Sequence, residues 1–188
     1  MKRKIPKPSS LLFALFIILL IIPQTRTPIQ VALNRAKLLV WSPSELAAED
    51  QTQLEPFTYQ LRDLNGTPRT IEIGMGKVIF ISYWATWCPP CIAELPSIEK
   101  LYADYGEQVN FILITNEDPE VVTRFLEKKQ YDLPVFNPRM QTPEALFDRS
   151  IPTNYVIDGK AKVIIKETGV ADWDSEKVRG VLEELIKK

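Results

Sequence analysis

The stretch Tyr83–Leu95, YWATWCPPCIAEL, decides the fold, because it joins a strand pattern to a helix pattern through Cys88 and Cys91, the two cysteines of the chain. Before it, VIFISYW (Val78–Trp84) is a continuous apolar run, which is typical of a strand covered on both faces. After it, apolar residues recur at spacings of three and four, and this spacing predicts a helix that ends at Gly106. Both cysteines are therefore expected at the corner between a buried strand and a helix.

The corner position gives the two cysteines different chemistry. Backbone amides at a helix N-terminus are unpaired and the helix dipole is positive there, so a thiolate at Cys88 is stabilised. Two intervening residues let Cys91, one turn into the helix, close onto Cys88. Pro89 and Pro90 have no N–H and stiffen the turn. The pattern predicts Cys88 as an exposed nucleophile and Cys91 as a more buried resolving thiol.

Other uses of a cysteine pair fit the sequence less well. A structural zinc site needs four ligands, and the chain has two cysteines and no histidine. Copper binding through cysteine and histidine fails for the same reason. A structural disulfide is permitted in an oxidising compartment, but closing so short a loop constrains the unfolded chain very little. Redox catalysis is the favoured interpretation, and a structural disulfide stays open as the alternative.

Turn and periodicity signals divide the rest of the chain into strands and helices. The Asn65-Gly66 pair predicts a hairpin, and Asp118 followed by Pro119 predicts the start of a helix. Strands are predicted at residues 57–63, 70–73, 78–84, 109–115, 133–136, 153–158 and 161–168, and helices at residues 92–105, 117–130, 142–148 and 175–188. This order implies a mixed sheet between helices, which is a three-layer α/β domain.

The N-terminus has the charge pattern of an export or membrane segment. Four basic residues among the first ten precede twelve apolar residues, Leu11–Ile22, and Pro23 follows. This order is typical of a secretory signal or of an N-terminal anchor. Because no Ala-x-Ala-like cleavage site follows, we expect residues 11–23 to be an uncleaved transmembrane anchor behind a basic cytoplasmic stretch, residues 1–10. A cleaved signal peptide and a buried core helix are the alternatives.

Residues 24–54 are interpreted as a juxtamembrane linker that leads to a domain at residues 55–188. A short amphipathic helix on the membrane surface, ended by Pro43, is the alternative, but only Arg35 and Lys37 supply basic charge there. The domain is then expected on the extracytoplasmic, periplasmic side of the cell membrane.

The composition argues against several classes of function. At 188 residues, of which 45% are hydrophobic and 25% charged, the chain has the composition of a globular protein and the length for one domain. All 24 acidic residues lie after residue 30, where they outnumber the basic ones, so no nucleic-acid surface is indicated. The sequence has no glycine-rich phosphate loop, and no metal, flavin or nucleotide cofactor is expected.

Two motifs far apart in the chain carry a family resemblance. VIFISYWATWCPPC, with SIPTNYVIDGKAKVI downstream, resembles the membrane-anchored TlpA/ResA/CcmG-like thiol-disulfide oxidoreductases over Phe57–Lys188. The resemblance implies a thioredoxin-like three-layer sandwich in which Pro152 is a cis-proline beside the disulfide. It also implies that the Ile151 backbone pairs with the extended chain of a substrate. The residues expected to bind substrate are Trp87, Pro89, Pro90, Ile151 and Pro152.

One departure from ordinary thioredoxins points to Glu94. A buried aspartate six residues before the first cysteine helps proton transfer in those proteins, and here Ser82 stands at that position. ResA-like members resemble this chain in carrying a glutamate three residues after the second cysteine, here Glu94. That spacing puts Glu94 on nearly the same helix face as Cys91, where a carboxylate with a raised pKa can exchange a proton with the thiol. A solvated surface glutamate is the alternative.

These features predict an extracytoplasmic enzyme that reduces protein disulfides through the Cys88/Cys91 dithiol. The resemblance implies substrates such as apocytochrome c and a membrane electron donor of the CcdA/DsbD type. A thiol peroxidase on the same fold is one alternative, although no arginine lies near the cysteines in sequence. A non-enzymatic binding module with a structural disulfide is the other.

Overall fold

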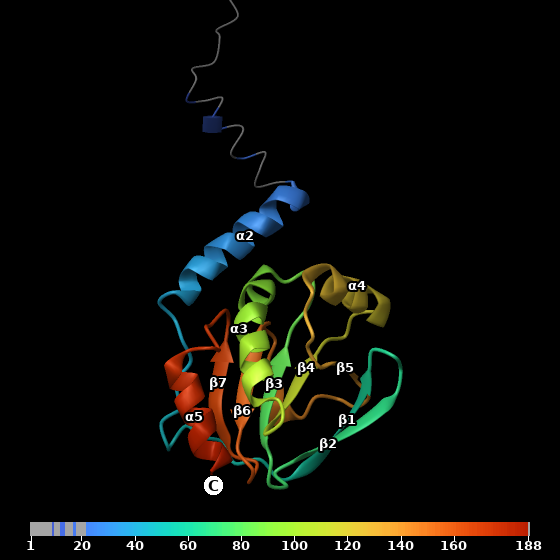
Figure 1. The fold of residues 1–188 in the computed structure, drawn as a ribbon, viewed down its shortest axis with the longest axis vertical. Helices are drawn as coiled ribbons and strands as arrows, with labels where there is room; N and C mark the ends of the chain where they lie inside the picture. Colours follow the sequence, from blue (N-terminus) through green and yellow to red (C-terminus); the bar gives the residue numbers. More distant parts are fainter. Residues whose placement is uncertain (1–8, 10–11, 14–16, 18–21, 188) are drawn as a thin grey trace, which may run out of the picture.

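The computed structural model describes residues 9, 12, 13, 17 and 22–187, and Figure 1 shows how their elements are arranged. In chain order the elements are α2 (Pro23–Leu38), β1 (Phe57–Asp63), β2 (Pro68–Ile73), β3 (Val78–Tyr83), α3 (Pro89–Tyr105), β4 (Val109–Ile114), α4 (Pro119–Lys129), β5 (Val135–Pro138), the short 3₁₀ helix η1 (Glu144–Leu146), β6 (Thr153–Ile157), β7 (Val163–Thr168) and α5 (Glu176–Ile186). The strands form one sheet in the order β2-β1-β5-β4-β3-β6-β7.

The sheet is mixed, as predicted. Strand β3 is parallel to β4, and β4 is parallel to β5, whereas β6 runs antiparallel to β3 and β7 runs antiparallel to β6. Because Tyr83 at the end of β3 pairs with Thr153 at the start of β6, the loops that flank these two residues lie at the same edge of the sheet. This register brings the segment around residue 88 next to the segment around residue 151.

Local signals fix most element boundaries close to their predicted positions. The Asp118 side chain accepts a hydrogen bond from the backbone N–H of Glu120 and caps α4, which begins at Pro119. Ser175 caps α5 in the same way. Several predictions are less accurate. Helix α3 begins three residues before its predicted start, β2 begins two residues before, and β5 and β7 begin two residues after. The predicted short helix at residues 142–148 is reduced to η1.

The two faces of the sheet are covered differently. Val78 and Phe80 of β3 belong to a hydrophobic cluster that also contains residues of α3, α4 and α5. Ile79 and Ile81, which point the other way, belong to a second cluster that includes Leu54 and η1 and, among the described residues, nothing from α3, α4 or α5. The predicted sheet between helices is therefore right for one face only.

The handedness of the crossovers explains this one-sided cover. The connections β3-α3-β4 and β4-α4-β5 join parallel strands and step across the sheet in the same direction. Because such crossovers are almost always right-handed, both helices lie on the same face. The second face is covered by η1 and by the irregular segment before β1. The backbone N–H of Leu54 in that segment donates a hydrogen bond to the carbonyl of Ala161 in the β6–β7 hairpin.

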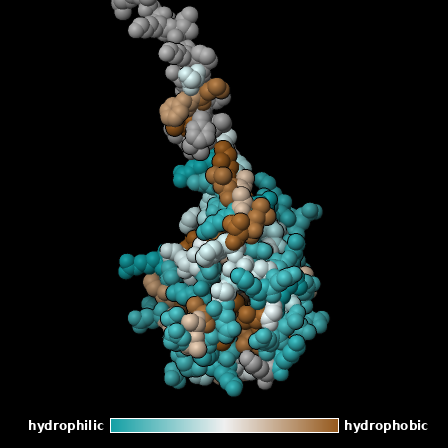
Figure 2. Space-filling model, turned by 90° about the vertical axis from the view of Figure 1, so that its left-hand side faces the viewer, coloured by the Kyte–Doolittle hydropathy of each residue, from teal (hydrophilic) through white to brown (hydrophobic). Residues whose placement is uncertain are grey.

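The segment before the domain contains a helix, which the preferred interpretation as a plain linker did not include. Residues Pro23–Leu38 form α2, in which a proline occupies the first turn and Ala32, Leu33 and Ala36 favour a helix. Helix α2 packs against α3. Its hydrophobic side chains gather above a domain surface that is mostly hydrophilic (Figure 2), and Leu33 of this helix is largely exposed, as is Val40 shortly after it. Helix α2 thus occupies residues 24–38 of the predicted linker, residues 24–54, and the linker role and the domain boundary at residue 55 stay predictions.

The expected membrane anchor at residues 11–23 lies mostly outside the described residues. Within the part of the chain that the structure describes, no helix has both the length and the apolar character needed to cross a bilayer. The anchor therefore stays a prediction.

Candidate active site

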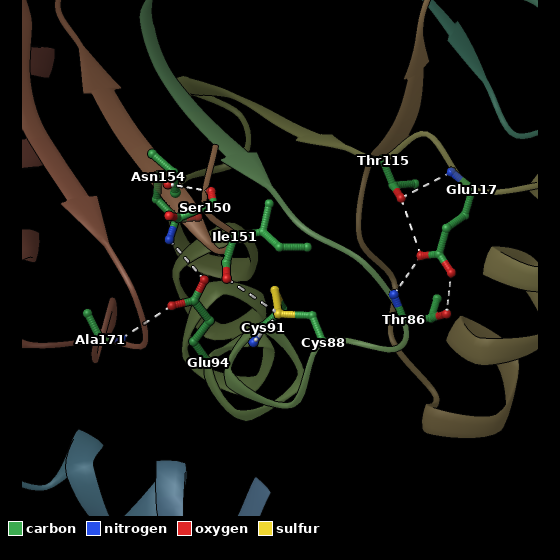
Figure 3. Close-up of a disulfide and its surroundings, with 11 residues drawn as sticks. Thr86, Cys88, Cys91, Glu94, Thr115, Glu117, Ser150, Ile151, Asn154 and Ala171 are labelled. Atoms are coloured by element: carbon green, nitrogen blue, oxygen red, sulfur yellow. Dashed lines mark hydrogen bonds between the residues drawn. A yellow bond between two sulfur atoms is a disulfide. The ribbon is translucent and has the colours of Figure 1, made fainter. Parts of the chain in front are cut away.

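The two cysteines form a disulfide at the N-terminus of α3 (Figure 3). Cys88 is the residue that caps this helix, and the backbone N–H of Cys91 donates a hydrogen bond to the Cys88 Sγ at 3.2 Å. Pro89 and Pro90 form the first turn, where their missing N–H groups are not needed. A sulfur at Cys88 therefore faces the positive end of the helix, as the sequence predicts.

The predicted difference in exposure between the two sulfurs is smaller than expected. Cys91 is fully buried, and Cys88 is only 3% exposed, so the prediction of an exposed Cys88 is wrong for the disulfide state. The reason is the neighbouring loop, whose Ile151 carbonyl oxygen lies 3.7 Å from the Cys88 Sγ.

The Ile151–Pro152 peptide bond is cis, which confirms what the resemblance implied. The pairing of β3 with β6 explains why this loop reaches a disulfide some sixty residues away, because Pro152 directly precedes β6 and the corner directly follows β3. Pairing of a substrate chain with Ile151 stays a prediction.

A cleft of about 350 Å³ lies beside the disulfide. Trp87, Ile151 and Phe147 are among its lining residues, and Trp87 and Phe147 are largely exposed. Trp84, by contrast, is buried and packs on Phe125, which agrees with its predicted place in the core. The cleft thus has an apolar wall that includes Trp87 and Phe147, and it reaches Ile151, whose carbonyl lies close to the Cys88 sulfur.

The predicted substrate-binding residues do not all face this cleft. Pro89 and Pro90 line a second hollow instead, together with Trp87 of the corner and with Arg26 and Gln30 of α2. Trp87 contributes to both hollows. Helix α2 therefore lies beside the corner, an arrangement that the sequence did not indicate.

Sequence reasoning missed Glu117, which holds the loop that precedes Cys88. The backbone N–H and the hydroxyl of Thr86 both donate to the Glu117 carboxylate at 2.6 Å, and the Thr115 hydroxyl donates to it at 3.3 Å (Figure 3). The Asn137 side chain in turn donates to the carbonyl of Glu117 at 3.0 Å. A charged residue after a buried strand was the only signal in the sequence, and it did not reveal its partner across the sheet edge.

Glu94 is buried, 1% exposed, so the alternative of a solvated glutamate is wrong. Its Oε1 accepts a hydrogen bond from the Asn154 amide at 2.9 Å, and its Oε2 accepts one from the Ala171 N–H at 3.3 Å (Figure 3). Burial raises the pKa of Glu94 to about 8, against the opposing effect of Asn154, Ala171 and Trp173. A carboxylic acid that titrates near the pKa of a thiol thus lies one helical turn after Cys91.

Ser82 of β3 lies opposite Asn154, the residue that bonds Glu94. Ser82 pairs with Asn154 across the sheet and is fully buried. Its hydroxyl makes no hydrogen bond to any described residue. With a serine here, the predicted proton-exchange role falls to Glu94, a buried carboxyl one helical turn after Cys91 on α3.

Glu94 also predicts a stability that falls as the pH rises. Between its pKa in an unfolded chain, 4.5, and its folded pKa of about 8, the folded protein holds one more proton than the unfolded protein. The contribution of Glu94 is therefore complete below pH 4.5 and is lost as the pH rises through about 8. In that window it lowers the free energy of unfolding by about 1.4 kcal/mol per pH unit.

Denaturant unfolding of the oxidised chain between pH 5 and 8 measures this slope. In a Glu94→Gln variant, which cannot ionise there, we expect the slope to be smaller by that amount. Equal slopes in the two proteins would show that Glu94 is charged throughout the range.

The described residues contain no group of three or more histidine, cysteine, aspartate or glutamate side chains that could hold a metal ion.

Comparison with known proteins identifies a family and the fold. The Redoxin family matches residues 49–183. Thiol-disulfide oxidoreductase ResA of Halalkalibacterium halodurans is 33% identical over 118 residues, which cover 61% of this chain and 67% of the relative. ResA of Bacillus cereus is 30% identical over 135 residues, which cover 70% of this chain and 76% of the relative. The structure of StoA from Bacillus subtilis matches with a TM-score of 0.52 at 18% identity, over 71% of this chain and 98% of StoA. The thioredoxin-like α/β fold with a mixed sheet is thus confirmed.

Proposed function

The chain belongs to the Redoxin family, and from that premise we propose that it reduces disulfides of protein substrates outside the cytoplasm through the Cys88/Cys91 dithiol. It is a thiol-disulfide oxidoreductase, since the Redoxin match at residues 49–183 includes both cysteines and relatives of that name are 30–33% identical to the chain. The direction of electron flow, the compartment and the substrates are the proposed parts.

The geometry of Cys88 supports this function most directly. Its sulfur accepts a hydrogen bond from the Cys91 N–H at the positive end of α3, which stabilises the thiolate that begins the reaction. The Ile151 carbonyl lies 3.7 Å from the same sulfur, so a substrate strand that bonds this backbone edge holds its disulfide beside the nucleophile.

The reaction proceeds in two exchanges. The Cys88 thiolate attacks one sulfur of the substrate disulfide, forms a mixed disulfide and releases the other substrate sulfur as a thiolate. Cys91 then gives its proton to the Glu94 carboxylate and attacks the Cys88 sulfur, which releases the second substrate thiolate. The substrate gains two electrons, and the enzyme is left with the Cys88–Cys91 disulfide that the structure shows.

Glu94 suits both directions of this proton transfer. A carboxyl with a pKa of about 8 is close to a thiol in acidity, so moving a proton between them costs little. In the disulfide state at neutral pH, Glu94 is mostly protonated and can give its proton to Cys91 when a donor reopens the disulfide. We infer that this donor is a membrane protein of the CcdA/DsbD type and that apocytochrome c is one substrate.

The compartment is part of the proposal. A basic stretch before an apolar segment at residues 11–23 supports a single N-terminal anchor, with the catalytic domain on the periplasmic side. Sequencing the N-terminus of the mature protein from membrane and soluble fractions tests this point. A mature chain that begins beyond residue 22 would leave a secreted or periplasmic protein without an anchor.

Competing substrates test the reaction class. The reduced chain is mixed with a peptide disulfide and, separately, with hydrogen peroxide, and the loss of its thiols is followed over time. We expect the peptide disulfide to react faster, with two substrate thiols formed for each enzyme disulfide. Faster reaction with peroxide would favour the thiol peroxidase, and a disulfide that mild reductants leave intact would favour the binding module.

A further inference from the structure

Trp41, three residues after the end of α2, makes two contacts with the catalytic domain. Its indole N–H donates a hydrogen bond to the Glu167 Oε1 on β7 at 3.1 Å. Its carbonyl oxygen accepts a hydrogen bond from the backbone N–H of Asp172 at 3.0 Å. Trp41 is itself about half exposed, so neither contact is explained by burial in the core.

Both partners of Trp41 border the residues that hold Glu94. Glu167 is the cross-strand partner of Asn154, and the Asn154 amide donates to one oxygen of Glu94. Asp172 directly follows Ala171, whose N–H donates to the other oxygen of Glu94. Trp41 therefore bonds one residue that pairs with Asn154 and one residue that follows Ala171, and Asn154 and Ala171 are the residues that hold the Glu94 carboxyl.

We propose that Trp41 is a positioning residue for the redox site, which holds the Glu167 carboxylate on β7 opposite Asn154, the residue that bonds Glu94. The inference rests on the proposed exchange of a proton between Glu94 and Cys91. It connects the N-terminal helix α2, through the segment that follows it, to the group that serves the resolving cysteine.

The groups around Glu94 decide whether its pKa rises or falls when the Glu167 charge is removed. From β6 and the loop after β7, Asn154, Ala171 and Trp173 contribute uncharged dipoles that favour the carboxylate, and on α3 itself Cys91 is held in the disulfide. Glu167 on β7 is the charged residue whose repulsion raises the pKa of Glu94 further. Removing that negative charge therefore makes Glu94 a stronger acid.

The indole N–H decides where the Glu167 carboxylate lies. Glu167 is only partly buried, and a carboxylate without a hydrogen-bond partner gains hydration by moving away from the sheet. Phenylalanine at position 41 retains the aromatic ring and the backbone carbonyl but cannot donate. The freed carboxylate then moves into water, and its repulsion of Glu94 weakens.

Three variants of the full-length oxidised chain in detergent test this arrangement: Trp41→Phe, Glu167→Gln and the two combined. The side-chain carboxyl carbon of Glu94, assigned by its loss in Glu94→Gln, is titrated by NMR. We expect both single variants to lower its midpoint by about half a pH unit, the scale of a partly screened charge pair. The combined variant should show no larger shift than Glu167→Gln alone, because the tryptophan acts through the glutamate.

The matched control is Glu183→Gln on α5, which removes an equal charge from a surface glutamate bonded by Tyr105. It should leave the Glu94 midpoint unchanged. An unchanged midpoint in Glu167→Gln overturns the inference, as does a Trp41→Phe shift that persists when Glu167 is already glutamine.

A second readout separates this inference from the proposed function. The rate of peptide disulfide reduction is measured against pH in the same variants. If the rate profile moves with the Glu94 midpoint, both ideas are supported. If the midpoint moves and the rate profile does not, the positioning by Trp41 stands and the proton exchange between Glu94 and Cys91 is wrong.

Discussion

Replacement of Cys88 by serine is expected to lower the rate of peptide disulfide reduction by more than about 10³-fold, because a serine hydroxyl forms no nucleophilic anion at neutral pH. The Cys91 N–H and the end of α3 that favour a thiolate at position 88 cannot compensate for this loss. The measurement is the release of substrate thiols by the reduced variant under single-turnover conditions.

The fold should survive this change. The disulfide closes a loop between residues only three apart, so losing it changes the entropy of the unfolded chain very little. An unchanged far-ultraviolet circular dichroism spectrum is the control. A Cys88→Ser variant that still reduces the peptide at a tenth or more of the original rate would identify Cys91 as the attacking thiol instead.

A Cys91→Ala variant is expected to lose turnover almost completely and to accumulate a mixed disulfide with its substrate. Cys88 can still attack, but the buried thiol that completes the reaction is missing, so the covalent intermediate persists. Non-reducing electrophoresis and intact mass measurement should show close to one substrate bound per chain, attached through Cys88.

The combined Cys88→Ala and Cys91→Ala variant is the control and should bind no substrate covalently. If Cys91→Ala forms no adduct while Cys88→Ala does, the order of attack is reversed. If neither single variant forms an adduct with any peptide disulfide, the disulfide is a structural feature and the binding module is favoured.

Much of the fold was predictable because its signals are local. The apolar run before the corner, the spacing after it and the Asp118-Pro119 helix start each depend on neighbouring residues, and the structure confirms each of them. The predicted corner position of the two cysteines is also right, although the helix begins at Pro89, three residues before its predicted start. The pairing of strands that are distant in sequence was not derivable in this way, and Pro152 was placed beside Cys88 only by resemblance.

What the sequence did not indicate depends on contacts between distant segments. Glu117 bonds Thr86 thirty-one residues away, and Trp41 bonds Glu167 across more than a hundred. Each is a polar residue in a loop or at the end of a helix, where a sequence pattern gives no partner. The burial of Glu94 was open for the same reason, since its spacing from Cys91 fixed its helix face but not what covers that face.

The one-sided packing of the helices was predictable in principle. It follows from the right-handed crossovers of two consecutive parallel connections, once the strand order is known. That order requires β5 to lie between β1 and β4, and β5 is only four residues long. A strand this short carries too little pattern for its neighbours to be assigned from sequence.

The midpoint reduction potential of the Cys88–Cys91 pair in the full-length chain tests the reductase assignment most directly. Equilibration with glutathione or dithiothreitol buffers, followed by alkylation and mass measurement, gives the fraction of chains in each state. The account predicts a value near thioredoxin's, roughly −270 mV, at which the dithiol donates electrons to most exposed disulfides. A value of roughly −120 to −180 mV would make the protein an oxidant or an isomerase and would contradict it.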